Sequence, residues 1–154
     1  MKEIPLIDTN LLLLFVIGSV DHGNYINSSK RLGDFTFDDY KILIEYISSF
    51  QNFATTPYIL TEVSNLIDLH DYASDQAYDT VQYIAKMAEV IDVIPRNDTQ
   101  HTHFKKYGIT DVNILNIALT RPVVTNDKRL STFAYTLCPV DNIVPWYIIK
   151  ARNN

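Results

Sequence analysis

The sequence predicts an α/β domain built around a mostly parallel sheet. Short apolar runs of strand length alternate along the chain with longer segments in which apolar residues recur at helical spacing. This alternation favours a parallel sheet, because each helix carries the chain back to the start of the next strand. With 154 residues, of which 47% are hydrophobic, one core and a single domain over residues 1–154 are expected.

The first strand, helix and loop are predicted from apolar and polar runs in residues 4–37. Residues 4–7 are apolar and are closed by Asp8, which predicts a short strand. The apolar residues 11–17 then continue as a buried helix. Residues 18–37 are rich in Gly, Ser, Asn and Asp, and they indicate a long surface loop.

Two helix starts are visible in the next part of the chain. Thr36 and Asp39 have the spacing of a capping box, so a helix is expected to begin there. Residues 52–55 predict a second strand. Thr56 is a good N-cap and precedes a proline, which suits the first position of a helix, so a helix is expected over residues 57–69.

The second half of the chain repeats this alternation. The expected elements are helices over residues 72–89, 97–107, 111–119 and 127–137, and strands over residues 90–94, 122–125 and 141–144. Gly108 is expected to end one of these helices and Thr110 to cap the next. The last strand is expected at an edge of the sheet.

Composition and charge exclude several classes of protein. Thirteen basic and eighteen acidic residues give a net charge of −5, which argues against a broad basic surface for nucleic acid but leaves a local phosphate site open. Residues 11–17 form the longest apolar run, well short of the roughly twenty residues that span a bilayer, so no contact with a membrane is expected. A single cysteine, Cys138, indicates a buried thiol and a cytoplasmic location.

Four carboxylates are expected at one edge of the sheet. Asp8 follows the first strand, and Glu62 lies early in the helix after the second. Asp111 begins a later helix, and Asp127 directly follows the fourth strand. Open parallel sheets bind ligands at the carboxyl ends of their strands, so these side chains are expected to converge. Taken singly, each acid is also explained as a helix cap or first-turn residue worth less than about 1 kcal/mol.

Clustered carboxylates favour a particular chemistry. Without nearby cations they raise one another's pKa values by repulsion, and a divalent metal ion relieves that conflict. Ligands that are all oxygen favour Mg²⁺ or Mn²⁺ over zinc. Such ions acidify water and stabilise charge on phosphoryl oxygens, so hydrolysis of a phosphodiester is the expected reaction.

The residues around these acids resemble the PIN-domain nucleases over nearly the whole chain. The matching segments are Leu6-Ile7-Asp8-Thr9-Asn10-Leu11, Leu60-Thr61-Glu62-Val63, Thr110-Asp111-Val112-Asn113-Ile114, Ile117-Ala118 and Val123-Val124-Thr125-Asn126-Asp127. The family's series of Asp, Glu, Asp and Asp is present. So are its Asn two residues after the first Asp and its Thr-x-Asp after the fourth strand.

The resemblance implies a PIN-like three-layer α/β/α fold and Mg²⁺- or Mn²⁺-dependent cleavage of RNA, commonly by the toxin of a toxin–antitoxin pair. A small antitoxin protein is then an expected partner. The implied catalytic and metal-binding residues are Asp8, Glu62, Asp111 and Asp127. Asn10 and Thr125 are the implied supporting residues, which orient the acids or a bound water.

Several further residues are candidates for contacts with RNA or with a second copy of the chain. Candidate phosphate contacts are Lys30, Arg31, Lys128 and Arg129, together with Lys105 and Lys106; the alternative for each is ordinary solvated charge. Dimerisation is common among look-alikes. Trp146, Ile148 and Ile149 near the C-terminus either form such a contact or cover the core.

Two other functions remain as alternatives. In the placement of Asp8 after the first strand, the chain resembles the haloacid-dehalogenase phosphatases, in which such an aspartate is the covalent nucleophile. Those enzymes carry a second Asp two residues later, where this chain has Asn10. The other alternative is a non-catalytic PIN-like module that binds RNA or protein, in which the acids cap helices or hold a structural ion.

Overall fold

A five-stranded, all-parallel sheet forms the centre of the computed structural model, which describes residues 2–153. The strands are β1 (Leu6–Ile7), β2 (Ala54–Thr55), β3 (Glu89–Val90), β4 (Val123–Thr125) and β5 (Ile143–Pro145). Their order is β3-β2-β1-β4-β5, so β1 lies in the middle with β2 and β4 as its neighbours. The predicted parallel α/β sheet is therefore confirmed, although each strand is shorter than predicted.

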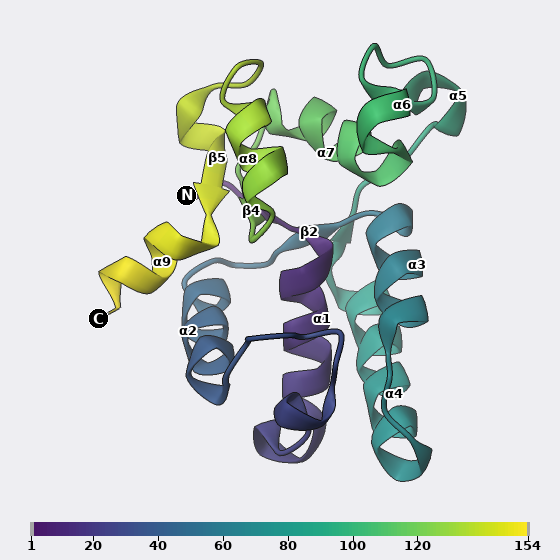
Figure 1. The fold of residues 1–154 in the computed structure, drawn as a ribbon, viewed down its shortest axis with the longest axis vertical. Coiled ribbons are helices and arrows are strands. Elements are labelled where there is room, and N and C mark those ends of the chain that lie inside the picture. Colours follow the sequence, from purple (N-terminus) through teal and green to yellow (C-terminus); the bar gives the residue numbers. More distant parts are fainter. Residues whose placement is uncertain (1, 154) are drawn as a thin grey trace.

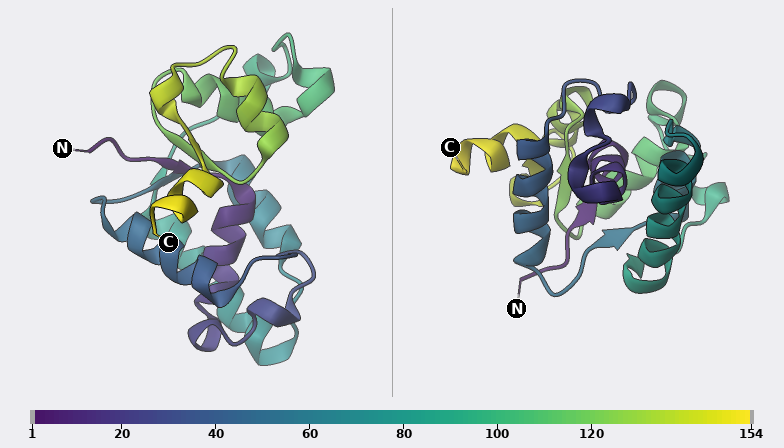
Figure 2. Two further views of the ribbon diagram at one scale, coloured as in Figure 1. Left: turned by 60° about the vertical axis from the view of Figure 1, so that its left-hand side comes forward. Right: turned by 90° about the horizontal axis from the view of Figure 1, so that it is seen from below.

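Helices cover the sheet on two sides. They are α1 (Thr9–Gly18), α2 (Phe37–Ser48), α3 (Pro57–Leu66), α4 (Asp71–Met87), α5 (Pro95–Asp98), α6 (Phe104–Tyr107), α7 (Ile109–Ala118), α8 (Lys128–Ala134) and α9 (Trp146–Arg152). Figure 1 shows α1 to α4 on one side of the strands and α5 to α8 on the other, as in a three-layer α/β/α arrangement. Figure 2 shows that α9 continues from the edge of the sheet and lies beside α2.

Helix α1 is the centre of the lower helical layer in Figure 1. It packs against both α2 and α3, and residues 11–14 are completely buried. A helix that is apolar on every side needs partners all round, which explains why the run 11–17 has no polar face. Burial of these four leucines ties the first strand and helix to most of the core.

Local capping signals in the sequence are confirmed. The Thr36 hydroxyl accepts a hydrogen bond from Asp39 N (3.2 Å), and Asp39 Oδ2 accepts one from Thr36 N (2.9 Å), so the capping box of α2 is complete. Thr56 Oγ1 accepts from the backbone N–H of Ile59 (3.1 Å) and caps α3, which begins with a proline as predicted. Such caps involve residues only three positions apart, so the sequence alone can specify them.

Two predictions in the second half of the chain are wrong. The helix expected over residues 97–107 is divided into α5 and α6, with turns over 99–103 between them. In these turns His101 Nδ1 accepts a hydrogen bond from the backbone N–H of His103 (3.1 Å), a side-chain bond that competes with helix formation. Thr110 does not cap α7, because the helix already begins at Ile109 and the Thr110 side chain bonds elsewhere.

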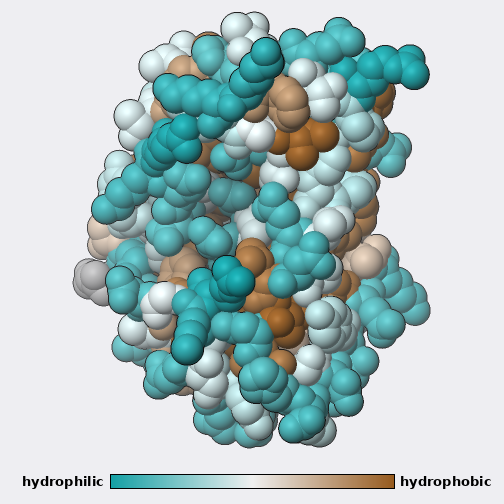
Figure 3. All heavy atoms as spheres, turned by 45° about the vertical axis from the view of Figure 1, so that its right-hand side comes forward, coloured by the Kyte–Doolittle hydropathy of each residue, from teal (hydrophilic) through white to brown (hydrophobic). Residues whose placement is uncertain are grey.

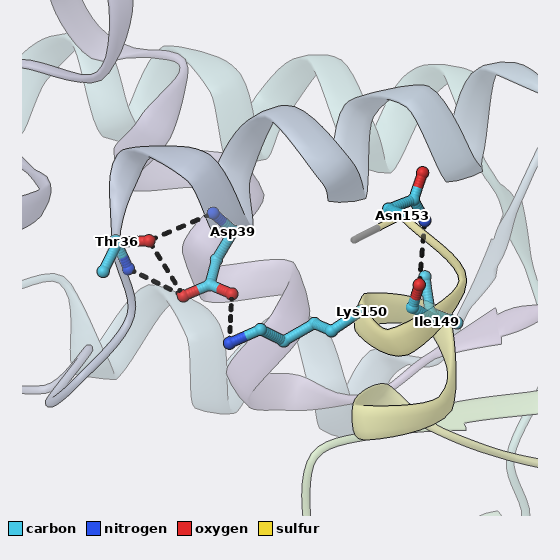
Figure 4. Close-up of polar contacts among 5 residues, drawn as sticks. All are labelled: Thr36, Asp39, Ile149, Lys150 and Asn153. Atoms are coloured by element: carbon cyan, nitrogen blue, oxygen red, sulfur yellow. Dashed lines mark hydrogen bonds and ion pairs between the residues drawn. The ribbon is translucent and has the colours of Figure 1, made fainter.

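The C-terminal helix α9 was not predicted. Trp146 and Ile149 are almost completely buried (3% and 2% exposed), so of their two expected roles the structure shows the covering of the core. Figure 4 shows how α9 is attached to α2: Lys150 Nζ lies 2.9 Å from Asp39 Oδ1. Although burial opposes ionisation of Asp39, hydrogen bonds from Lys150 and Thr36 hold its pKa below the usual value.

The long segment between α1 and α2 contains more secondary structure and more buried contacts than the surface loop that the sequence predicts. It contains two short 3₁₀ turns, Val20–Gly23 and Ile26–Ser28, and buries Leu32 against the core. Ser29 Oγ donates to Asp68 Oδ1 (2.6 Å), which fastens the segment to the connection between α3 and α4.

The outer surface is mixed. Figure 3 shows hydrophobic residues set among hydrophilic ones on the face that carries α3 and α4. In the part of the chain that the structure describes, no helix is both long and apolar enough to cross a membrane.

Packing between α1 and α2 leads to a first prediction. A Cβ atom at Gly18 would overlap the ring of Tyr40, so Gly18→Ala is expected to destabilise the protein by about 1–3 kcal/mol. Urea denaturation measures the change. In a Tyr40→Leu background the same substitution is expected to cost much less, and an equal cost in both backgrounds would contradict the proposed overlap.

Candidate active site

The four carboxylates predicted from the sequence lie where the direction of the strand order changes. From β1 the chain proceeds outward to β2 and β3, and it then returns to β4 on the other side of β1. Asp8 follows β1 and Asp127 follows β4, so both lie at the carboxyl ends of adjacent strands. In Figure 1 this point lies in the middle of the molecule, where β1 leads into α1. Such a reversal leaves a crevice that open α/β sheets use to bind ligands.

Asp8 is the most deeply buried of the four acids. It is 8% exposed and caps α1: Oδ1 accepts from the backbone N–H of Thr9 (2.7 Å) and Oδ2 from the Thr125 hydroxyl (2.6 Å). Burial nevertheless raises its pKa above the usual value, and the charges of Asp127 and Glu62 add to the increase. The side chain is therefore held rigidly in a position that disfavours its negative charge.

Asp127 is joined to Asp8 through one hydroxyl. Its backbone N–H donates to Thr125 Oγ1 (3.0 Å), and that hydroxyl in turn donates to Asp8. Asp127 Oδ1 accepts from the backbone N–H of Leu130 (3.0 Å), so this acid is also the N-cap of α8. Capping and a place in the cluster are thus compatible.

Glu62 is held by two threonines that the sequence reasoning missed. Thr9 Oγ1 donates to Glu62 Oε2 (2.9 Å), and Thr110 Oγ1 donates to Glu62 Oε1 (2.6 Å). Each threonine stands next in the chain to a predicted acid, one after Asp8 and one before Asp111. That adjacency is a signal that both threonines lie near the acids, but it does not identify Glu62 as their partner, because Glu62 is 53 and 48 positions away.

Asp111 carries the clearest electrostatic signature. It lies in the first turn of α7 and is partly buried. Its pKa is raised to about 7, first by burial and then by the charges of Asp8, Asp127 and Glu62; Arg129 partly offsets this increase. The four acids are therefore close enough to repel one another, and together they lack sufficient compensating positive charge.

Other predicted residues lie in α1, in α8 and in the segment between α1 and α2. Asn10 is exposed in the first turn of α1, and Lys128 and Arg129 begin α8 directly after Asp127. Lys30 and Arg31 are exposed beyond the C-terminal end of α3, where their backbone N–H groups donate to Asp68.

The donor set fits a hard divalent cation, although the carboxylates are not arranged as ligands. Within residues 2–153, no three His, Cys, Asp or Glu side chains form a group that could hold a metal ion as they stand. The oxygens of Asp8 and Glu62 are bonded to protein hydroxyls and an amide. Their chemistry is that of Mg²⁺ or Mn²⁺ ligands, and burial together with the charges of the other three acids raises the pKa of Asp111.

Comparison of this chain with models of protein families, with curated proteins and with solved structures found no match.

Proposed function

We propose that this protein is a PIN-like, Mg²⁺- or Mn²⁺-dependent ribonuclease, with Asp8, Glu62, Asp111 and Asp127 holding the ion. The observation that supports this proposal best is the convergence of the acids: Thr125 links Asp8 to Asp127, and Thr9 and Thr110, each next to another acid, both bond Glu62. The pKa of Asp111, raised to about 7 by burial and by the three other acids, agrees with this convergence. A protein that only needed helix caps would have no reason to gather four carboxylates from four segments of the chain. A divalent cation at this point would remove their mutual repulsion.

The residues of the chain have distinct parts in this proposal. Thr125 orients Asp8 relative to Asp127, while Thr9 and Thr110 fix both oxygens of Glu62. Because its pKa is raised to about 7, Asp111 would bind a cation in competition with a proton. When bound, the ion supplies an acidified water and offsets charge on the phosphoryl oxygens.

Wild-type protein and a metal screen test the proposal. End-labelled single-stranded RNA is expected to be cleaved at internal phosphodiester bonds when Mn²⁺ or Mg²⁺ is present and to stay intact in EDTA. The melting temperature of the protein is expected to rise with Mn²⁺, because an ion that binds only the folded state stabilises it. RNA binding without cleavage under every metal would overturn the proposal in favour of a non-catalytic binding module.

The phosphatase alternative receives less support from the residues after β1. Those enzymes carry a second aspartate two residues after the nucleophile, and this chain has an exposed asparagine, Asn10, at that position. Covalent labelling of Asp8 by a phosphate ester would reverse this preference.

The role as a toxin, with a small antitoxin as partner, rests on the resemblance to PIN-domain nucleases. Expression of the wild-type chain is expected to arrest bacterial growth, and Asp8→Asn is expected to abolish the arrest at equal protein level. Arrest by both forms would mean that cleavage is not its cause, and no arrest in the native host would count against the toxin role.

A further inference from the structure

A cluster of two cations and two aromatic rings joins α6 to α8 beside the candidate active site. We call Lys106, Tyr107, Arg129 and Phe133 the α6–α8 cluster. The rings of Tyr107 and Phe133 stack with centroids 5.0 Å apart, and the Arg129 guanidinium carbon lies 4.7 Å from the centroid of Tyr107. Lys106 Nζ lies 5.4 Å from the same centroid and 6.0 Å from that of Phe133. The rings therefore hold both cations by cation–π attraction.

The cluster has a fixed backbone frame. Arg129 Nη2 donates to the backbone carbonyl of Lys106 (3.2 Å), which ties the start of α8 to α6. His103 adds an edge-on contact to Phe133, with centroids 4.6 Å apart. Long side chains lose much freedom when they bind a ligand, and cations that are already positioned lose less.

The two cations keep their charge available. The ion pairs within residues 2–153 are Lys41 with Asp38, Arg121 with Glu89, and Lys150 with Asp39. Neither Lys106 nor Arg129 takes part in one, and a ring face attracts a cation without neutralising it. Basic residues also outnumber acidic ones in the neighbouring helices. Helices α5, α6 and α8 together contain five of the chain's thirteen basic residues and one acid, Asp98.

The cluster adjoins the carboxylates. Arg129 follows Asp127 by two residues, and its charge lowers the pKa of Asp111 against the effect of the three acids. Three residues separate Tyr107 from Asp111 along the chain. A negatively charged polymer that reaches the acids therefore meets positive charge within the same region, in a protein whose net charge is −5.

We propose that Lys106 and Arg129 bind backbone phosphates of the RNA on one side of the cleaved bond, and that Tyr107 and Phe133 act as positioning residues for these two cations. This inference rests on the proposed ribonuclease function and adds the direction from which the strand enters: along α6 and α8. In this inference Tyr107 and Phe133 act through the faces of their rings, and the hydroxyl group of Tyr107 has no part.

Binding to a short fluorescein-labelled single-stranded RNA in EDTA tests the inference without requiring cleavage. Lys106→Gln/Arg129→Gln is expected to raise Kd about tenfold and to reduce the slope of log Kd against log salt by about 1.4, the value for two phosphate contacts to a single strand. Lys41→Gln/Lys86→Gln removes the same charge from α2 and α4 and is the matched control; its Kd is expected to stay within about twofold. Equal losses in both double variants would overturn the inference.

A pair of variants at one position tests the positioning role. Tyr107→Phe keeps the ring and is expected to bind RNA as the wild type does. Tyr107→Leu removes the ring face and is expected to raise Kd and KM about fivefold with kcat unchanged. A loss of kcat at unchanged KM, or equal behaviour of the two variants, would exclude the positioning role.

The results separate this inference from the proposed function. If the wild type cleaves RNA with Mn²⁺ but the Lys106→Gln/Arg129→Gln variant binds equally well, the inference is wrong and the function stands. If the wild type neither binds nor cleaves RNA, the proposed function itself is wrong.

Discussion

Asp8→Asn and Asp127→Asn are each expected to reduce Mn²⁺-dependent RNA cleavage by at least about 100-fold. Loss of a residue that only orients a metal ligand costs up to about 100-fold, and loss of a ligand itself is expected to cost at least as much. Each substitution removes a negative oxygen ligand from the proposed ion site. Initial rates on end-labelled RNA at saturating Mn²⁺ measure the loss.

Both variants are expected to fold. An asparagine at position 8 can still accept from Thr9 N through its carbonyl and can donate to the Thr125 hydroxyl through its amide. At position 127 asparagine caps a helix as well as aspartate does. Because each change also removes like-charge repulsion, the melting temperature without metal is expected to be unchanged or higher.

Asp75→Asn is the matched control for these two variants. Asp75 is exposed on α4, so its substitution is expected to leave both cleavage and stability unchanged. Full cleavage by the Asp8 and Asp127 variants would remove the proposed metal site.

Asp111→Asn is expected to stabilise the metal-free protein above pH 7 by about 1–2 kcal/mol. This free energy is smaller than the whole pKa shift of Asp111 would give, because solvent screens a carboxyl that is partly exposed. The folded pKa of Asp111, about 7, lies above the ordinary 3.8. Between these values the folded protein holds a proton that the unfolded chain has lost, so wild-type stability falls as pH rises. Below about pH 4 both states are protonated and this difference disappears.

Urea denaturation in EDTA from about pH 4 to pH 8 checks this sign, since the substitution removes the pH dependence due to this one group. The helix dipole favours a charge at this first-turn position, but by less than about 1 kcal/mol, so it does not reverse the result. Added Mn²⁺ is expected to stabilise the wild type more at high pH, because the ion competes with the proton. Parallel stability curves for wild type and variant would contradict the raised pKa.

The parts of the fold that could be predicted from the sequence depend on neighbours in the chain. The capping box of Thr36 with Asp39 and the Thr56 cap were recognisable because their bonds span three residues. The parallel sheet followed from the alternation of strand-like and helical segments. The carboxylates could be assigned to one edge because the carboxyl ends of parallel strands share that edge.

The features that were missed depend on contacts between distant residues. The helix expected over 97–107 is interrupted where Asp98 is buried and accepts a hydrogen bond from Tyr58 of α3 (2.8 Å). The bonds from Thr9 and Thr110 to Glu62 join residues 53 and 48 positions apart, so no local pattern contains them. Helix α9 is stabilised by the burial of Trp146 and Ile149, which a seven-residue segment does not reveal by its periodicity.

The central position of β1 has a consequence for the order of events on the ribosome. Asp8 is synthesised well before one neighbour of its strand, because β4 begins more than a hundred residues later and Asp127 follows β4. Until that part has emerged, a nascent polypeptide has neither the completed centre of its sheet nor its fourth acid. If the proposed function is right, products that stop before residue 123 lack part of the proposed ion site and are expected to show no Mn²⁺-dependent cleavage of RNA.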